Sequence, residues 1–328
     1  MAELIAAPRA AALLARMTNR RVVVVGDVMI DEWIWGDVSR ISPEAPVPVV
    51  AVRDHSFTLG GAGNVANNLR ALGAHVAFVG GIGDDAEGTR LRAMFDDLGV
   101  DAHGLVTLHD RPTTRKTRVV AHSQQVVRAD WESTAPLRDD DRARIVDAVR
   151  FALRDADAVV LSDYAKGLLH REIVEAALGA PVVVADPKPQ NVAMFAGVTC
   201  IAPNVGEAAR ASGIAIADDA SLDRAARALQ LQLGCRYVLV TRGEHGMSLF
   251  GEGHERFDVP AVARTVFDVS GAGDTVVAVL TLALAAGIAA ETATQLANFA
   301  AGAVVEKLGT ATASPSEIVA LMEHEHAG

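Results

Sequence analysis

The sequence predicts an α/β fold in which a mostly parallel central sheet carries helices on both faces. Half of the 328 residues are hydrophobic and only 4% are aromatic, which suits helices packed on a parallel sheet. Short branched apolar runs alternate with stretches of helical spacing along most of the chain. Polar residues follow several of these runs, as expected where ligands bind beyond the carboxyl ends of parallel strands.

The first strand is predicted at 21–27 (RVVVVGD), a branched run that ends in a Gly-Asp turn. A second strand at 75–85 leads into a helix over 86–100, whose apolar residues recur at helical spacing. Further strands are predicted at 155–164, 180–188, 198–204 and 235–243, with helical stretches between most of them. The polar residues at the strand ends, where a site should form, are Asp27, Asp163, Asp186, Asn204 and Arg242.

Two segments, 43–57 and 111–132, break this alternation because they have β character without intervening helices. Prolines at 43, 46 and 48 would confine the first of them to a sheet edge. Together the segments predict a small antiparallel sheet, the β lid, formed by insertions around 32–57 and 110–131. No linker or internal repeat is evident, so residues 1–328 are predicted to form a single domain with this lid.

Composition and charge disfavour several classes of protein. The formal net charge of −11 argues against a general nucleic-acid binder, which needs clustered Lys and Arg. The longest apolar run, 276–290, is shorter than the ~18–20 residues of a membrane span, and residues 1–17 resemble a short amphipathic helix rather than a signal peptide. Cys200 and Cys235 form no CxxC pair. We therefore expect a cytoplasmic protein without nucleic-acid or membrane partners.

The glycine cluster at 59–73 contains GAGNVA, which matches a weak dinucleotide-binding fingerprint. The segment before it is a poor buried strand, so a nicotinamide enzyme is not favoured, and the chain contains no P-loop motif. Two interpretations stay open. Gly60, Gly61 and Gly63 permit a tight turn before a helix, or they let backbone N–H groups and Asn64 approach a polyhydroxyl ligand.

The second glycine cluster, GAGDT at 271–275, indicates a site for phosphoryl transfer. Gly271 and Gly273 leave backbone N–H groups free at the start of a helix, which is a ready anion site. An ordinary first-turn acid would also explain Asp274, but the apolar run after it indicates a buried helix with a charge at its N-terminus. Phosphoryl transfer to an alcohol requires such N–H groups beside a carboxylate that accepts the hydroxyl proton.

These motifs resemble those of the ribokinase-like (PfkB) family of carbohydrate kinases over nearly the whole chain: DVSGAGDT (268–275), GGAGNVANNLRALGA (60–74) and GGIGDDAEG (80–88). Four other segments, 26–50, 124–130, 162–169 and 186–188, are similar to the D-glycero-D-manno-heptose 7-phosphate kinases within that family. The resemblance implies transfer of the ATP γ-phosphoryl to the anomeric hydroxyl of this sugar phosphate in lipopolysaccharide core synthesis. Many relatives carry a fused nucleotidyltransferase domain with an HxGH motif; EHEHAG at the C-terminus lacks it, so a stand-alone kinase is expected.

The resemblance also implies roles for individual residues. Asp274 would be the catalytic base, and the N–H groups of Ala272, Gly273 and Asp274, after Gly271, would form the anion hole. The residues implied in sugar binding are Asp27, Asp31, Gly60, Gly61 and Asn64.

Nucleotide and metal sites are implied in the same way. Asn204 and Glu207 match an N-x-x-E motif that organises Mg²⁺ and phosphates, and residues three apart share one helix face. Asp268 and Ser270 correspond to a monovalent-cation site in some members, which leaves K⁺ open. The other residues implied in ATP binding are Lys188, Thr241, Arg242, Gly243, Asn298 and Gly302.

Arg115, Lys116 and Arg118 form a basic cluster in the predicted lid. A strand face exposed to solvent would explain this cluster as well as a phosphate-binding site would. The hypothesis is that basic residues of the lid supply part of the contact with the 7-phosphate. The chain is expected to form a homodimer through the lid, so the contacting lid could belong to the partner subunit. Two interpretations of Trp33 and Trp35 stay open: their side chains line a sugar pocket, or they pack at the lid hinge. The alternatives are another PfkB kinase acting on ribose, fructose or fructose phosphate, and a non-catalytic sugar-binding protein.

Overall fold

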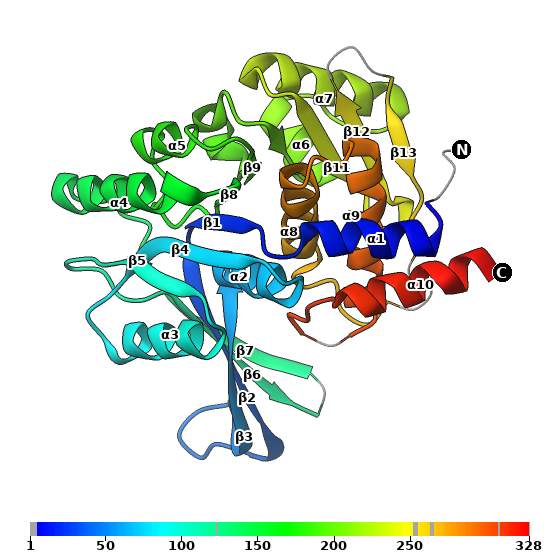
Figure 1. The fold of residues 1–328 in the computed structure, drawn as a ribbon. Coiled ribbons are helices and arrows are strands. Elements are labelled where there is room, and N and C mark those ends of the chain that lie inside the picture. Colours follow the sequence, from blue (N-terminus) through cyan, green and yellow to red (C-terminus); the bar gives the residue numbers. More distant parts are fainter. Residues whose placement is uncertain (1–4, 123, 252–254, 263–265, 308, 328) are drawn as a thin grey trace.

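The computed structural model describes residues 5–122, 124–251, 255–262, 266–307 and 309–327 (Figure 1). Its main sheet has the strand order β13-β12-β11-β10-β9-β8-β1-β4-β5. Neighbouring strands are parallel except for the antiparallel pairs β11–β12 and β12–β13, which confirms the predicted, mostly parallel sheet. The strands are β1 Arg21–Gly26, β4 His75–Ile82, β5 Asp101–Thr107, β8 Ala158–Ser162, β9 Val183–Asp186, β10 Cys200–Ile201, β11 Tyr237–Thr241, β12 Met247–Gly251 and β13 Phe257–Val259.

Helices cover both faces of this sheet because its central strands bury side chains on both sides (Figure 1). In β1, Val22 and Val24 belong to one apolar core, and Val23 and Val25 belong to the other. The first core includes residues of α1, α2, α3, α8, α9 and α10, and the second those of α4 to α7. The helices are α1 Ala7–Met17, α2 Ala62–Ala71, α3 Ala86–Asp97, α4 Asp139–Ala152, α5 Arg171–Ala177, α6 Val205–Ser212, α7 Asp219–Leu233, α8 Ala272–Ala285, α9 Ala290–Val305 and α10 Pro315–Ala327, with short 3₁₀ turns η1 Leu153–Asp155, η2 Pro189–Phe195 and η3 Gly243–His245.

The β lid is a second sheet that projects from the α/β body, with the strand order β3-β2-β6-β7 (Figure 1). Its two hairpins are antiparallel, but the central pair β2–β6 is parallel, so the prediction of an entirely antiparallel lid is wrong. The pair β2–β6 is parallel because both strands run outward from the α/β body. The lid strands are β2 Val28–Ile41, β3 Pro48–Gly61, β6 Arg115–Ala121 and β7 Gln124–Trp131.

The prolines act as predicted. Pro43 and Pro46 lie in the turn between β2 and β3, and Pro48 opens β3, which is an edge strand of the lid. An edge strand loses no ladder bond when its first residue lacks an N–H group. The prolines are therefore compatible with the edge position of β3.

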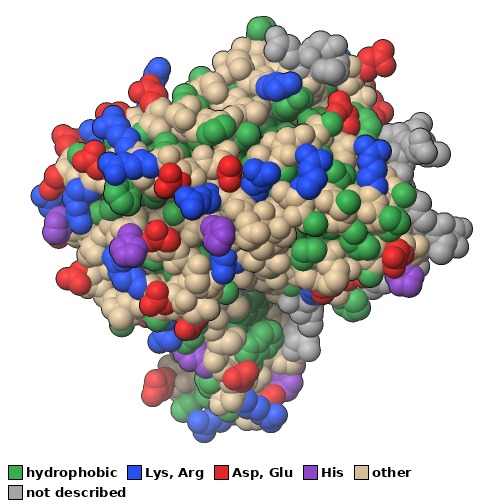
Figure 2. Space-filling model, viewed as in Figure 1, with side chains coloured by type: hydrophobic (Ala, Val, Ile, Leu, Met, Phe, Trp, Pro, Cys, Tyr) green, Lys and Arg blue, Asp and Glu red, His purple; other side chains and the backbone are tan. Residues whose placement is uncertain are grey.

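One face of the molecule, seen in Figure 2, mixes basic and acidic side chains over the part where α4 lies in Figure 1 and shows apolar side chains where α1 and α10 lie. These two helices border an apolar groove lined by Ala11, Leu14, Ala15, Val319 and Ala320 among others. In the part of the chain that the structure describes, no helix combines the length and apolar character that a membrane span requires.

Candidate active site

Asp274 lies in the first turn of α8, directly after the N-cap residue Gly271 and Ala272–Gly273. Its side chain is buried, and residues 274–283 of the helix are buried as well. Oδ2 of Asp274 accepts a hydrogen bond from Asn64 Nδ2 at 2.7 Å, and Oδ1 accepts one from the Tyr164 hydroxyl at 2.7 Å. The two glycine clusters therefore meet, because Asn64 is in the first turn of α2 and Asp274 is in the first turn of α8.

Burial raises the pKa of Asp274 to about 6, although the hydrogen bonds from Asn64 and Tyr164 and the charge of Lys188 lower it. The carboxylate of Asp31 is close enough to contribute a further rise. Such a group is still mostly ionised at neutral pH, and it is a stronger base than an ordinary aspartate. The geometry gives Asp274 the properties of a general base.

The turn before α8 requires glycine at position 271. Gly271 has φ +81°, and a Cβ there would lie 2.6 Å from Asn64 Nδ2, so a larger residue would block the bond from Asn64 to Asp274. Gly273 is exposed, and nothing would lie within 4 Å of a Cβ on it.

Two of the three N–H groups predicted for the anion hole are open. The N–H of Ala272 donates to Val269 O at 3.3 Å. Those of Gly273 and Asp274 have no hydrogen-bond acceptor among the described residues, as expected in the first turn of a helix. Together with the helix dipole they provide a place for an anion beside the carboxylate.

Asp27, at the end of β1, uses its carboxylate to hold the loop at 163–168. Oδ2 accepts the backbone N–H groups of Tyr164 at 2.9 Å and Lys166 at 3.0 Å, and Oδ1 accepts that of Leu168 at 3.1 Å. Burial raises the pKa of Asp27, while these three bonds lower it. The carboxylate predicted to hold sugar hydroxyls thus fixes the loop that carries Tyr164.

Asp31 and Arg118 bring the lid to the site. Arg118 Nη1 lies 2.5 Å from Asp31 Oδ1, and its guanidinium lies 4.9 Å from the ring centre of Trp33. A Cβ at Gly60 would collide with the Asp31 carboxylate, so β3 approaches β2 this closely only with glycine there. A Cβ on Gly61, which precedes α2, would meet the backbone of Asp27.

The structure does not bring the three predicted basic residues together on one face of the lid. Because side chains alternate along a strand, Lys116 and Arg118 share a face of β6, and Arg115 lies on the other. Lys116 Nζ pairs with Asp130 at 2.8 Å, whereas Arg115 Nη1 pairs at 2.6 Å with Glu87 of α3. Each of the three cations is therefore neutralised by an acid, and Arg118 is the one beside Asp31.

Asn204 and Glu207 form a capping box at the start of α6. Asn204 Oδ1 accepts the Glu207 N–H at 2.9 Å, and Glu207 Oε2 accepts the Asn204 N–H at 3.1 Å. The other oxygen of Glu207 lies 2.7 Å from Lys188 Nζ. The N-x-x-E motif therefore starts the helix and holds the lysine at the same time.

Asp186 is the last residue of β9, and Lys188 lies two residues further along the chain. Burial lowers the pKa of Lys188, but Asp186 and Glu207 raise it by more, so the ammonium stays charged. Burial raises the pKa of Asp186 to about 7, against the effect of Lys188. The same edge of the sheet thus collects several acids around one lysine.

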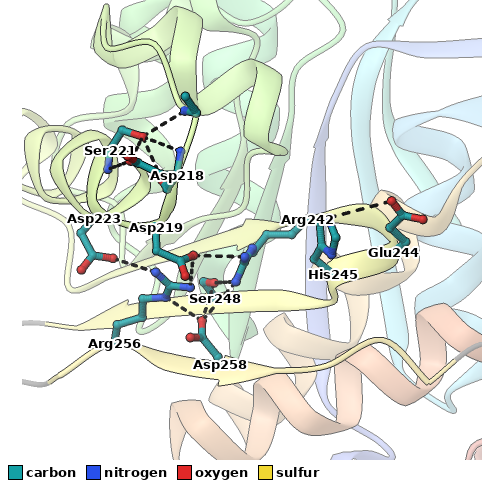
Figure 3. A network of polar contacts seen from close by, with 11 residues as sticks. Asp218, Asp219, Ser221, Asp223, Arg242, Glu244, His245, Ser248, Arg256 and Asp258 are labelled. Atoms are coloured by element: carbon teal, nitrogen blue, oxygen red, sulfur yellow. Dashed lines mark hydrogen bonds and ion pairs between the residues drawn. The ribbon is translucent and has the colours of Figure 1, made fainter.

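Arg242 lies in a polar network between β11, β12 and α7 (Figure 3). Its guanidinium is 3.1 Å from Ser248 Oγ and 3.2 Å from Asp219 Oδ1. Arg256 pairs with Asp219 at 2.7 Å and with Asp258 at 2.7 Å. The two hydrogen bonds use two of the five N–H donors of the Arg242 guanidinium.

Hydrogen bonds to other parts of the chain hold several of the remaining predicted residues. Thr241 donates its N–H to Pro203 O at 3.0 Å, and Gly243, with φ +58°, opens η3. Asn298, buried in α9, donates to Pro260 O at 2.8 Å, and Gly302 is buried one turn further along. Asp268 accepts the N–H of Ser270 at 2.9 Å and that of Gly309 at 3.0 Å.

Comparison with known proteins identifies the family. The pfkB family of carbohydrate kinases matches residues 19–317. The chain belongs to this family. Two curated relatives named "Bifunctional protein HldE", from Desulfatibacillum aliphaticivorans and Geobacter sulfurreducens, are 48% and 45% identical over 310 and 320 residues. These alignments cover 93% and 96% of this kinase-family chain but only 63% and 65% of the relatives' length.

Solved structures of two sugar kinases share the fold. The structure of Arabidopsis thaliana ribokinase complexed with ribose and ATP has a TM-score of 0.73 at 22% identity, covering 93% of this chain and 99% of that one. Phosphofructokinase-2 from Escherichia coli in complex with potassium has a TM-score of 0.80 at 18% identity, covering 94% and 99%. The ribokinase-like fold predicted from the motifs is confirmed.

Tyr164 is one of the residues of this candidate site to which the motifs assigned no role. It lies within the segment 162–169 and is one of two tyrosines in the chain. Asn68 and Thr275 were also missed: Thr275 Oγ1 donates to Asn68 Oδ1 at 2.8 Å and joins α8 to α2 one turn beyond the site. The signal for Tyr164 was its place as the last residue of the strand predicted at 155–164, because ligand sites form at the carboxyl ends of parallel strands.

Proposed function

We propose that this chain is an ATP-dependent kinase that phosphorylates the anomeric hydroxyl of D-glycero-D-manno-heptose 7-phosphate and forms the 1,7-bisphosphate. The observation that carries the proposal is the buried Asp274 carboxylate beside the open N–H groups of Gly273 and Asp274. The choice of sugar follows from the resemblance of segments 26–50 and 162–169, which supply Asp31 and Tyr164 to this site. The product would serve lipopolysaccharide core synthesis in the cytoplasm.

In the proposed reaction, the sugar hydroxyl oxygen bonds to the γ-phosphorus while the bond from that phosphorus to the bridging oxygen of ADP breaks. Asp274 orients the hydroxyl and takes its proton. Each carboxylate oxygen of Asp274 keeps a lone pair beyond its bond to Asn64 or Tyr164. The N–H groups of Gly273 and Asp274 stabilise the charge on the phosphoryl group in transfer.

The residues present fit a Mg²⁺ ion that arrives with ATP. Among the described residues, no group of three or more acidic, His or Cys side chains is arranged to hold a metal by itself. Mg²⁺ in kinases is bound largely by substrate phosphates and water, with one or two carboxylates. Glu207, paired with Lys188, would hold it through water, and the ion would neutralise charge on the β- and γ-phosphates. Asp268 is the candidate for a monovalent cation such as K⁺.

A substrate panel tests the proposal. In a coupled assay of ADP release, heptose 7-phosphate is expected to give a kcat/KM at least about 100-fold above ribose, fructose and fructose 6-phosphate, since a site built to pair a phosphate discriminates strongly against ligands that lack or misplace it. Efficient turnover of one of the other sugars would instead assign the chain to a different substrate within the family. If no ADP is released with any of these sugars, the proposed reaction is wrong.

We propose that Arg118 contacts the 7-phosphate, because it is the lid cation beside Asp31. Arg118→Gln is expected to raise the KM for heptose 7-phosphate about tenfold or more, the usual effect of losing a charged hydrogen bond, with little change in the KM for ATP. Arg115→Gln, on the opposite face of β6, serves as the comparison and should change the sugar KM much less. An equal rise in both variants would locate the phosphate elsewhere.

We also propose that two chains associate through the β lid. Its exposed apolar residues include Trp35, Val52, Val127 and Trp131, with 40%, 60%, 52% and 44% of their surfaces accessible. Light scattering should give a mass of twice 34.3 kDa, which Val127→Asp should reduce to that of one chain. Leu231→Asp, an equally drastic change on the exposed Leu231 of α7, should leave the mass unchanged. A monomeric wild-type protein would rule out this assembly.

A further inference from the structure

Tyr164 connects the two halves of the proposed site. Its hydroxyl donates to Asp274 Oδ1 at 2.7 Å, and the ammonium of Lys188 lies 5.3 Å from the centre of its ring. Lys188 in turn pairs with Glu207 of the capping box. Burial and the charge of Asp274 raise the pKa of the Tyr164 hydroxyl, so it stays protonated and can only serve Asp274 as a donor.

We propose that Tyr164 is a positioning residue for the catalytic base: its hydroxyl orients the Asp274 carboxylate and stabilises its ionised form. This role rests on the proposed function, because it assumes that Asp274 removes the proton of the acceptor hydroxyl. It goes beyond that function by adding a residue outside the two glycine clusters.

The loop that carries Tyr164 is built to hold the hydroxyl in place. Asp27 accepts three backbone N–H groups of this loop, and Asp163 Oδ1 accepts that of Ala165 at 2.7 Å. Ala165 has φ +54°, an unfavourable conformation for a residue with a side chain. Arg111 donates to Lys166 O at 2.8 Å. Three charged side chains, those of Asp27, Asp163 and Arg111, thus hold the backbone at and around Tyr164.

Asn64 holds the other carboxylate oxygen, so Asp274 has one donor on each side. With both bonds made, rotation of the carboxylate would break at least one of them. A hydrogen bond to the charged form of an acid lowers its pKa and opposes the effect of burial. Loss of the Tyr164 hydroxyl should therefore raise the pKa of Asp274.

Several charged groups surround Asp274, and the test must separate their effects from that of Tyr164. Asp31 faces it from β2, Asp186 from the end of β9 and Lys188 from the segment after β9, while α2 contributes the neutral Asn64. Arg118 pairs with Asp31. Tyr164→Phe leaves all of these groups in place, and it keeps the ring that faces Lys188. The variant removes the hydroxyl alone.

The experiment is the pH dependence of kcat/KM between about pH 5 and pH 9 for the full chain. Tyr164→Phe should move the acid limb upward by about one to two pH units, so that the rate falls about tenfold or more near pH 6 and approaches wild type near pH 9. The matched control is Tyr237→Phe, the chain's other tyrosine, on β11, which should keep the wild-type profile. An equal loss at every pH, or no loss, would overturn the positioning role.

A second measurement needs no substrate and so separates this inference from the proposed function. In protein labelled with ¹³C at the aspartate carboxyls, the signal of Asp274 is identified by its absence in Asp274→Asn. Its titration midpoint should rise in Tyr164→Phe and stay unchanged in Tyr237→Phe. This assignment also distinguishes Asp274 from Asp186, whose pKa of about 7 lies in the same range. An unchanged midpoint would overturn the inference, whichever sugar the enzyme accepts.

Discussion

Asp274→Asn is expected to lower kcat about 1000-fold or more at about pH 7.5, while ATP and the sugar phosphate still bind. The amide cannot accept the proton of the acceptor hydroxyl, although its oxygen can still accept from Asn64 and its NH₂ group can donate to the Tyr164 oxygen. Steady-state rates measure the loss in kcat, and calorimetry measures whether ATP still binds. Turnover above about a tenth of wild type would contradict the role of Asp274 as base.

The same substitution should stabilise the protein at neutral pH. Because folding raises the pKa of Asp274 from 3.8 to about 6, the carboxyl contributes stability below about pH 4 that is lost as the pH rises through 6. Asparagine never ionises, so the variant should be more stable than wild type by up to about 3 kcal/mol at about pH 7.5, with a smaller difference near pH 4.5.

Urea unfolding at the two pH values measures this difference. The control is Asp147→Asn on α4, because Asp147 is exposed and pairs loosely with Arg150 at 3.7 Å. It should change neither turnover nor the free energy of unfolding measurably. A loss of stability in Asp274→Asn at both pH values would mean that the carboxylate is a structural rather than a catalytic group.

Asp27→Ala should have the largest effect on stability. It removes the acceptor of three N–H groups, those of Tyr164, Lys166 and Leu168, in a buried setting. Each unsatisfied N–H costs about 1–3 kcal/mol, so the loss should be about 3 kcal/mol or more, a large part of a typical domain's total stability. Urea unfolding gives the loss in the free energy of unfolding.

Asp27→Asn provides an intermediate case if the alanine variant does not fold. Its oxygen can still accept from Tyr164 and Lys166, but its NH₂ group faces the N–H of Leu168. We expect a smaller loss of stability together with faster cleavage by trypsin after Lys166, since the loop at 163–168 is released. If both variants are as stable and as resistant to trypsin as wild type, Asp27 does not anchor the loop.

The main sheet was predictable because its strands are local apolar runs. The valines at 22–25 fill both cores of the sheet, so the strand is evident from composition alone. By contrast, β5, β12 and β13 were not predicted. In β5 only Leu105 and Val106 are buried, a run too short to indicate a strand, and β12 and β13 pair antiparallel without a helix between them. The parallel β2–β6 pair was missed because nothing local specifies how two hairpins lie side by side.

The site was predictable in part. The two glycine clusters were identified from their residues, but their meeting depends on a bond between Asn64 and Asp274, which are 210 residues apart. Tyr164 and Asp274 are 110 residues apart, so no spacing in the sequence relates them. The division between Arg115 and Arg118 follows from strand alternation once β6 is known, and the capping box of Asn204 and Glu207 is entirely local.

The most direct test of the central claim is to identify the product by ³¹P NMR after incubating the chain with ATP, Mg²⁺ and heptose 7-phosphate. We expect one new sugar phosphate signal coupled to the anomeric proton, with one ADP formed per phosphoryl transferred, and no detectable product or ADP with Asp274→Asn in the time that wild type needs to complete the reaction. ADP formed without a phosphate on the anomeric oxygen, or a product signal that persists in Asp274→Asn, would contradict the account.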